Sequence, residues 1–273
     1  MRRSYVVLVS LVSIVFVLAY VTTYMNALGS ICSDTRYLAK LFLALTYNPD
    51  TNSSLKYFAA MSPEAVTAIV WDYRGIDTFY ETTVFFMAII AALTIYRGVI
   101  SPASTTQGNG LSLIVKVVTK LLIPMNIAVA VSIAVHGHLT PGGGFQAGAA
   151  LAVVSVLLAV VFSGSSFDKL NISISKAVAL RSTGLLGIAA VTFIPLVYNL
   201  VTGVQAYLMQ SYVKADAPFA FPTHIWGQLI SGTLIWLNVA EFLAVSFGFF
   251  VVFMLLSLRE ETVRKYLGVG DGH

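Results

Sequence analysis

The amino-acid sequence predicts an all-α integral membrane protein with about six transmembrane helices, and three observations support this fold class. Hydrophobic residues make up 58% of the 273 residues, charged residues only 10%, and the mean hydropathy is +0.85. The apolar residues occur in runs of about 20, the length that about 30 Å of hydrocarbon requires. These runs lack the in-and-out alternation of barrel strands, and a backbone in lipid must satisfy its own hydrogen bonds, so helices are expected.

Six apolar segments meet this length criterion, at about 5–25, 78–96, 113–135, 145–162, 177–200 and 235–258. The first is too long for the apolar region of a signal peptide and lacks an A-x-A cleavage site, so we expect it to be a retained span. With both termini in the cytoplasm, Lys and Arg favour the cytoplasmic side by about two to one, Arg181 being counted there. The sequence therefore predicts a multi-pass protein of the cytoplasmic membrane with both ends inside.

Composition also excludes several functional classes. The formal net charge is +4, but Lys and Arg are scattered singly around apolar blocks, so no nucleic-acid partner is expected. The single cysteine, Cys32, excludes an internal disulfide and any haem or iron–sulfur cysteine pattern. We therefore expect no catalytic centre, no metal site and no cofactor in this chain.

A polar stretch at 101–110, between the second and third predicted spans, contains no charged or aromatic residue and reads as a linker. It divides the chain into a two-helix segment at 1–100 and a four-helix domain at 111–273. The two parts share no repeat, which argues against a self-contained inverted-repeat carrier. The role of residues 26–62 is not predicted.

A first charged cluster surrounds the start of the second predicted span and contains Asp72, Arg74, Asp77 and Glu81. A charge at a helix centre in the membrane costs about 2.5–3.5 kcal/mol on insertion scales, so each needs a reason. Asp77 and Glu81 are four residues apart and share a helix face. One interpretation is a capping box in which Thr78 is the N-cap and Glu81 reaches back to it, with Asp77 favoured by the positive helix end. The other is a proton or ion relay, and both remain open.

A second cluster, rich in glycine, joins the third and fourth predicted spans. Three glycines at 142–144 follow Pro141 and permit backbone conformations closed to other residues. No Lys follows them, so a phosphate-binding P-loop is excluded. His136 and His138 without a nearby Cys or carboxylate form an incomplete metal-ligand set. From residue chemistry alone we expect a tight re-entrant turn whose amides are satisfied by nearby polar side chains.

Both clusters resemble motifs of the Mrp-type cation/proton antiporter family. Residues 71–84 are similar to the D-[FY]-R-G-x-D-T-x-x-E-x-T-V motif of the A subunit, which also occurs as a separate subunit in archaeal hydrogenase complexes. That resemblance implies an ion-transport role for Arg74, Asp77 and Glu81. The glycine-rich loop is similar to the B-subunit signature G-H-x-x-P-G-G-G-F-x-x-G, which here comprises Gly137, His138, Pro141, Gly142, Gly143, Gly144, Phe145 and Gly148.

Two further intramembrane charges are ion-path candidates. Lys120, on the third predicted span, either reaches the interface or pairs with a carboxylate of a neighbouring subunit. Glu241 is the remaining acid, in the sixth predicted span, where no basic residue of the same span could neutralise it. It must be protonated, hydrogen-bonded to another helix or in contact with water, and we rank it below Glu81.

The resemblance implies a non-catalytic subunit of an antiporter module without a redox centre of its own. We expect partners among the other membrane subunits of the module, contact with the lipid bilayer, and Na⁺ and H⁺ as transported ions. The A-like and B-like parts in one chain favour a respiratory complex that couples electron transfer to ion translocation, such as a hydrogenase or a sulfur-reducing relative. The alternatives are a subunit of a free-standing Mrp Na⁺/H⁺ antiporter and a purely structural assembly subunit.

Overall fold

The computed structural model describes residues 2–24, 37–48, 54–99, 109–163, 167 and 173–268. Cys32, positions 101–108 of the predicted linker and parts of the 26–62 stretch lie outside them. The chain divides into two compact units, Met1–Leu41 and Phe42–His273. The proposed division at 101–110 stays a prediction about family relationships.

The first unit is built on helix α1, Arg2–Tyr24, which coincides with the first predicted span. Helix α2, Tyr37–Thr46, extends across the division between the units. The second unit continues with a 3₁₀ turn, a short helix, a π-helical turn and the long helices. Its elements are η1 Ser54–Phe58, α3 Ala65–Ala68, η2 Ile69–Tyr73, α4 Gly75–Tyr96, α5 Leu113–His136, α6 Gly144–Phe162, α8 Ile174–Thr202, β1 His224–Ile225, β2 Gln228–Leu229, α9 Thr233–Leu256 and α10 Glu260–Leu267.

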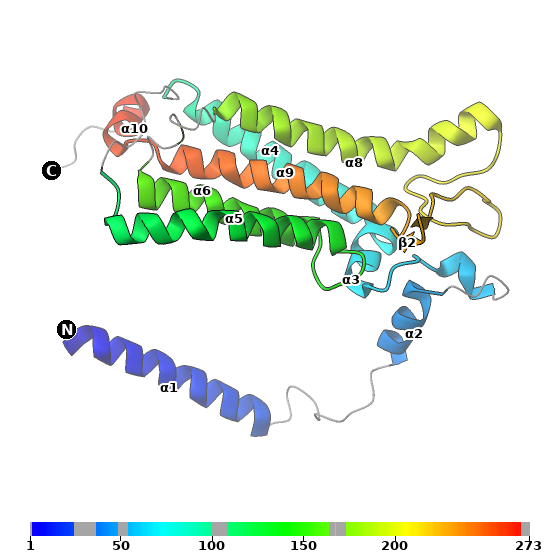
Figure 1. Cartoon of the computed structure of the whole chain (residues 1–273), viewed down its shortest axis with the longest axis horizontal. Helices are drawn as coiled ribbons and strands as arrows, with labels where there is room; N and C mark the ends of the chain where they lie inside the picture. Colours follow the sequence, from blue (N-terminus) through cyan, green and yellow to red (C-terminus); the bar gives the residue numbers. More distant parts are fainter. Residues whose placement is uncertain are drawn as a thin grey trace. The chain divides into compact units, whose positions relative to one another are not determined.

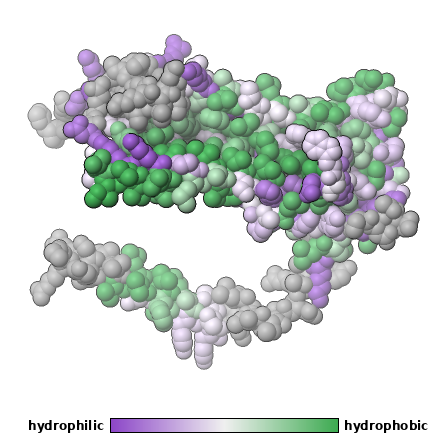
Figure 2. All heavy atoms as spheres, in the orientation of Figure 1, coloured by the Kyte–Doolittle hydropathy of each residue, from purple (hydrophilic) through white to green (hydrophobic). Residues whose placement is uncertain are grey.

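Five of the described helices, α4, α5, α6, α8 and α9, are long and apolar enough to cross a membrane. Each overlaps a predicted span to within a few residues, so the all-α membrane fold class is confirmed. The sidedness of the termini stays a prediction. Figure 2 shows hydrophobic side chains along the flanks of the second unit and hydrophilic ones concentrated toward its ends, the pattern that a bilayer imposes.

Helix α9 is the centre of the second unit. It contacts α4, α5, α6 and α8, and it is the most buried of the five long helices (Figure 1). Small residues allow the close approach: a Cβ on Gly184 of α8 would lie 2.6 Å from the Ala240 carbonyl oxygen of α9. Interfaces of small residues are the usual way that membrane helices pack tightly. The functional site is built around this central helix.

The start of α4 differs from the capping-box interpretation. The helix begins at Gly75, and its N-cap position is Arg74, at φ −126° and ψ 28°. Thr78 is therefore already inside the helix, and its hydroxyl donates to the Val70 carbonyl at 2.5 Å instead of capping. Asp77 lies in the first turn, where an acid is favoured by the helix dipole.

The segment before α4 is a single turn of α3 followed by the π-helix η2. Glu64 is the N-cap of α3, and its carboxylate accepts from the Thr67 amide at 2.5 Å. The wider π turn is unusual and frequently occurs at functional sites. Here it carries Trp71, which is fully buried, and Asp72, which is half-buried.

Candidate functional site

The side chain of Glu241 is the point at which the two sequence motifs meet. It projects from α9 and is only 6% exposed. Its Oε2 accepts a hydrogen bond from the Trp71 indole Nε1 at 3.2 Å, and the Phe145 backbone amide also donates to the carboxylate. Because Phe145 is in the first turn of α6, the acid lies at a positive helix end. One carboxylate thus joins η2, α6 and α9.

Gly144 makes room for this arrangement. A Cβ at this position would lie 2.6 Å from both the Cβ and the Oε2 of Glu241, and it would also overlap the Asn238 carbonyl oxygen. Any side chain there would push α6 away from α9. The glycine that the motif places at 144 is therefore required by the approach of a carboxylate on another helix.

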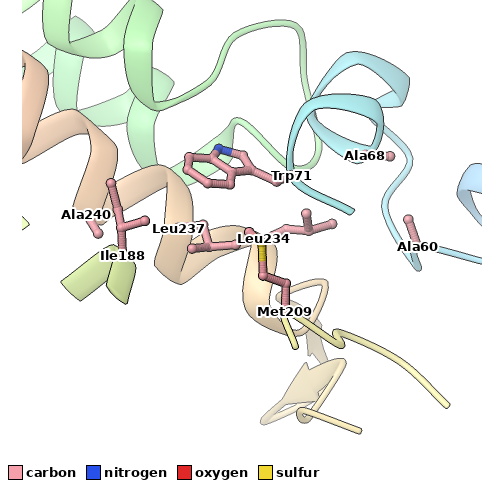
Figure 3. Close-up of a cluster of buried hydrophobic side chains, with 8 residues drawn as sticks. All are labelled: Ala60, Ala68, Trp71, Ile188, Met209, Leu234, Leu237 and Ala240. Carbon is pink, nitrogen blue, oxygen red and sulfur yellow. The ribbon is translucent and has the colours of Figure 1, made fainter. Parts of the chain in front are cut away.

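Trp71 is held by a rigid apolar surround. It packs with Leu234 and Leu237 of α9, Ile188 of α8 and Met209 in one cluster of buried side chains (Figure 3). The indole ring has no freedom to follow a moving carboxylate, so the position of its N–H is fixed. The cluster orients a hydrogen-bond donor toward Glu241 within an apolar environment, where such a bond is strengthened.

The glycine-rich loop is also hydrogen-bonded to the segment that precedes α4. The Thr67 hydroxyl donates to the Gly137 carbonyl at 2.6 Å, and the Ser62 hydroxyl donates to the His138 carbonyl at 2.7 Å. The Glu64 amide donates to the same His138 oxygen at 3.3 Å. These bonds connect residues on the two sides of the predicted linker, so the A-like and B-like motifs form one site.

His138 and Asn238 line the buried side of the loop. Burial lowers the pKa of His138, so the imidazole is neutral at pH 7. Its Nε2 lies 2.9 Å from the Leu229 carbonyl, which assigns the proton to Nε2. Among the described residues, His138 Nδ1 and both amide atoms of the fully buried Asn238 have no hydrogen-bond partner. Buried polar atoms of this kind favour the binding of a polar ligand or a cation.

The predicted ion-path residues of α4 lie on the outside of the bundle. Arg74 and Asp77 form an exposed ion pair at 2.6 Å, so the two charges largely neutralise each other. Glu81 lies one turn further along and is exposed. With Phe85 it lines a groove of about 680 Å³ that also includes Arg74 and Asp77. Glu81 is close enough to Glu241 to interact with it electrostatically. Glu81 thus lies on the outside of the helix bundle, and Glu241 lies inside it.

Two basic residues of the long helices lie in contrasting settings. Lys120 is exposed on α5 and does not belong to the buried network around Glu241. Arg181, counted above with the cytoplasmic ends, lies within α8 and is only 1% exposed. Its burial removes it from the topology count. The only sequence signal for a buried role is its position directly after an apolar stretch.

A second pocket, of about 330 Å³, opens beside η2 and is lined by Asp72, Arg74, Asp77, Tyr207 and Lys214, among others. Burial raises the pKa of Asp72 from 3.8 to about 6, and attraction by Lys214 offsets only part of this effect. A carboxyl whose pKa is higher in the folded state stabilises the fold below its unfolded pKa, and this stability is lost as the pH rises through 6.

Replacing Asp72 by Asn is therefore expected to raise the melting temperature at pH 8 and to leave it nearly unchanged at pH 4. The reason is that Asn removes a desolvated negative charge that exists only at the higher pH. Thermal unfolding in detergent at both pH values measures this difference. Glu261→Gln, a similar change at an exposed site on α10, is the control. Equal shifts at pH 4 and pH 8 would contradict the explanation.

Fold and site together define a multi-pass α-helical membrane protein with a carboxylate held inside its helix bundle. The family described as a domain related to the MnhB subunit of Na⁺/H⁺ antiporter matches residues 114–251, just over half of the chain. The chain belongs to this family, and the resemblance to an Mrp-type module is confirmed.

Similar proteins extend the likeness beyond the matched domain. An uncharacterised protein of Methanocaldococcus jannaschii is 25% identical over 223 residues, 74% of this chain and 80% of the relative. A chain of the membrane-bound sulfane sulfur reductase, an archaeal respiratory membrane complex, aligns with a TM-score of 0.56 and 21% identity over 92% of this chain and 98% of its own length. A chain of the Mrp complex from Dietzia sp. DQ12-45-1b gives a TM-score of 0.50 and 16% identity, over 92% of this chain and 26% of its own length. These two likenesses concern the fold.

Proposed function

We propose that this chain is a non-catalytic membrane subunit of a multi-subunit Mrp-type cation/proton antiporter module, within a respiratory complex that couples electron transfer to Na⁺ or H⁺ translocation. The observation that carries the proposal is the buried Glu241, held by the Trp71 indole and the start of α6. A carboxylate enclosed in a membrane bundle is costly, and acids in such positions mark ion pathways and proton relays. Other membrane subunits of the module are its partners.

In this proposal Glu81 and Glu241 act in sequence. Glu81, exposed in the α4 groove, receives a cation from a neighbouring subunit or from water. Glu241 exchanges that cation for a proton, because a single carboxylate in a site of low dielectric cannot hold both favourably. The amide of Asn238, one turn before Glu241, has no hydrogen-bond partner within the described part of the chain and offers a neutral oxygen ligand of the kind that Na⁺ accepts.

The respiratory setting is favoured over a free-standing antiporter by the extent of the structural matches. The chain aligns with nearly all of one chain in the sulfane sulfur reductase complex, but with only about a quarter of the matching chain in the Mrp complex. A unit of this size and arrangement of helices is therefore a separate subunit in the respiratory assembly. Co-purification of redox-active subunits with this chain would test the assignment.

The test of function is ion exchange by the whole complex, reconstituted into liposomes with and without this chain. We expect that a pH gradient drives ²²Na⁺ uptake only when the chain is present, and that the purified chain alone is inactive. Particle size must show that the other subunits remain assembled. Full exchange by the complex lacking this chain would contradict the proposal, as would exchange by the chain on its own, which would indicate a self-contained carrier.

A further inference from the structure

The side chain of Arg181 is a charge that the proposed exchange does not use. It projects from α8, is 1% exposed, and its three guanidinium nitrogens have no hydrogen-bond partner among the described residues. Its neighbours are aromatic rings of α4: the guanidinium carbon lies 4.7 Å from the Phe86 ring centre and 5.6 Å from that of Phe85. An arginine keeps its proton in proteins, so this is a permanent positive charge.

Arg181 lies near the middle of the bundle, about one helical turn beyond the acids. Glu81 and Glu241 lie near the starts of α4 and α9, at the end of the bundle that holds the glycine-rich loop (Figure 1). Arg181 lies two turns after the start of α8, whose direction is opposite, and it faces α4 one turn beyond Glu81. Lys120 lies further from the loop, toward the start of α5. Both bases therefore lie beyond the acids when the bundle is followed away from the glycine-rich loop.

We propose that Arg181 is an electrostatic barrier that stops cations at Glu81 and Glu241 from crossing to the other end of this chain. This inference rests on the proposed exchange function. A fixed arginine in a narrow membrane path repels cations, because little water is present to screen it. Cations that reach the acids must then leave sideways, along the α4 groove that Glu81 and Phe85 line, into a neighbouring subunit. This chain therefore forms one part of the ion path, and a neighbouring subunit forms the rest.

Packing alone does not explain an arginine at this position. Stacking on aromatic rings offsets only part of the cost of burying an unpaired charge. An apolar side chain of the same length would fill the space at no such cost. Packing therefore leaves the charge of Arg181 without an explanation.

The experiment measures passive ²²Na⁺ efflux from liposomes containing the whole complex, without a pH gradient or an electron donor. Arg181→Gln is expected to raise this leak on the order of tenfold, the effect of removing a unit charge at about 10 Å in an effective dielectric of about 20. Arg181→Lys keeps the charge and should leak no more than the wild type. Lys176→Gln removes the same charge from the exposed start of the same helix and should have no effect.

A wild-type leak in Arg181→Gln would overturn the barrier. So would a leak in Arg181→Lys as large as the leak in Arg181→Gln. Arg181→Met, which fills the space without charge, serves if the Gln variant fails to assemble, with the same expected leak. The double variant Arg181→Gln and Glu241→Gln should lose the leak again, since the cation then lacks its inner acid. Unchanged pH-driven exchange in Glu241→Gln would count against the exchange function. If Glu241→Gln loses exchange but Arg181→Gln shows no leak, only the barrier proposal is wrong.

Discussion

Glu241→Gln is expected to abolish pH-driven Na⁺/H⁺ exchange while leaving the complex assembled. Glutamine has nearly the shape of glutamate, and its amide oxygen can still accept from the Trp71 indole and the Phe145 amide. The hydrogen bonds that connect η2, α6 and α9 therefore persist. What is lost is the ability to bind and release a proton or to hold Na⁺ with a full charge.

The measurement is ²²Na⁺ uptake against an imposed pH gradient, with particle size and thermal unfolding as checks on assembly. Glu261→Gln makes the same chemical change on the exposed helix α10 and should exchange at the wild-type rate. Glu81→Gln should sharply reduce exchange, because the outer acid is lost. Wild-type exchange in an intact Glu241→Gln complex would rule out this carboxylate as the exchanging group.

Gly144→Ala should cause the largest structural loss of any single methyl addition in the loop. The new Cβ would lie 2.6 Å from the Cβ and the carboxylate of Glu241 and would overlap a backbone oxygen of α9, which cannot rotate away. Overpacking of this kind typically costs about 1–3 kcal/mol. We expect α6 to shift away from α9, which would break the bond from the Phe145 amide and reduce exchange together with thermal stability.

Gly187→Ala is the matched control for this change. It also adds a methyl group to a long helix facing α9, but the nearest atom is the Ala240 side chain, at 3.1 Å. A small adjustment accommodates it, and alanine favours the helix by about 1 kcal/mol over glycine. Melting temperature and ²²Na⁺ uptake should therefore separate the two variants. Equal behaviour would show that the contact with Glu241 does not require a glycine at 144.

The positions of the long helices could be predicted closely from the sequence, because hydrocarbon thickness fixes their lengths and their apolar composition sets them apart. The start of α4 is harder to predict from the sequence. A local pattern favoured a cap at Thr78, whereas the helix begins at Gly75 after a π turn. That turn depends on tertiary packing of Trp71, which no local rule contains.

The candidate site was predictable only in part. Glu81 and the glycine-rich loop are recognised through their motifs, whereas Glu241 ranks below Glu81 because no motif requires an acid at its position. The hydrogen bond from Trp71 spans 170 positions of the chain. The sequence also misplaces Arg181, because a basic residue near the end of an apolar run usually marks an interface, and only the packing of Phe85 and Phe86 reveals its burial.

The central position of α9 has a consequence for biogenesis. It is the last of the described long helices to emerge during synthesis, yet α4, α5, α6 and α8 all pack against it. Until it inserts, Trp71 and the glycine-rich loop have no acid to contact, and the earlier helices share no common core. A nascent chain that stalls before residue 233 would thus present open helix faces within the bilayer, a state suited to recognition by membrane quality-control proteases.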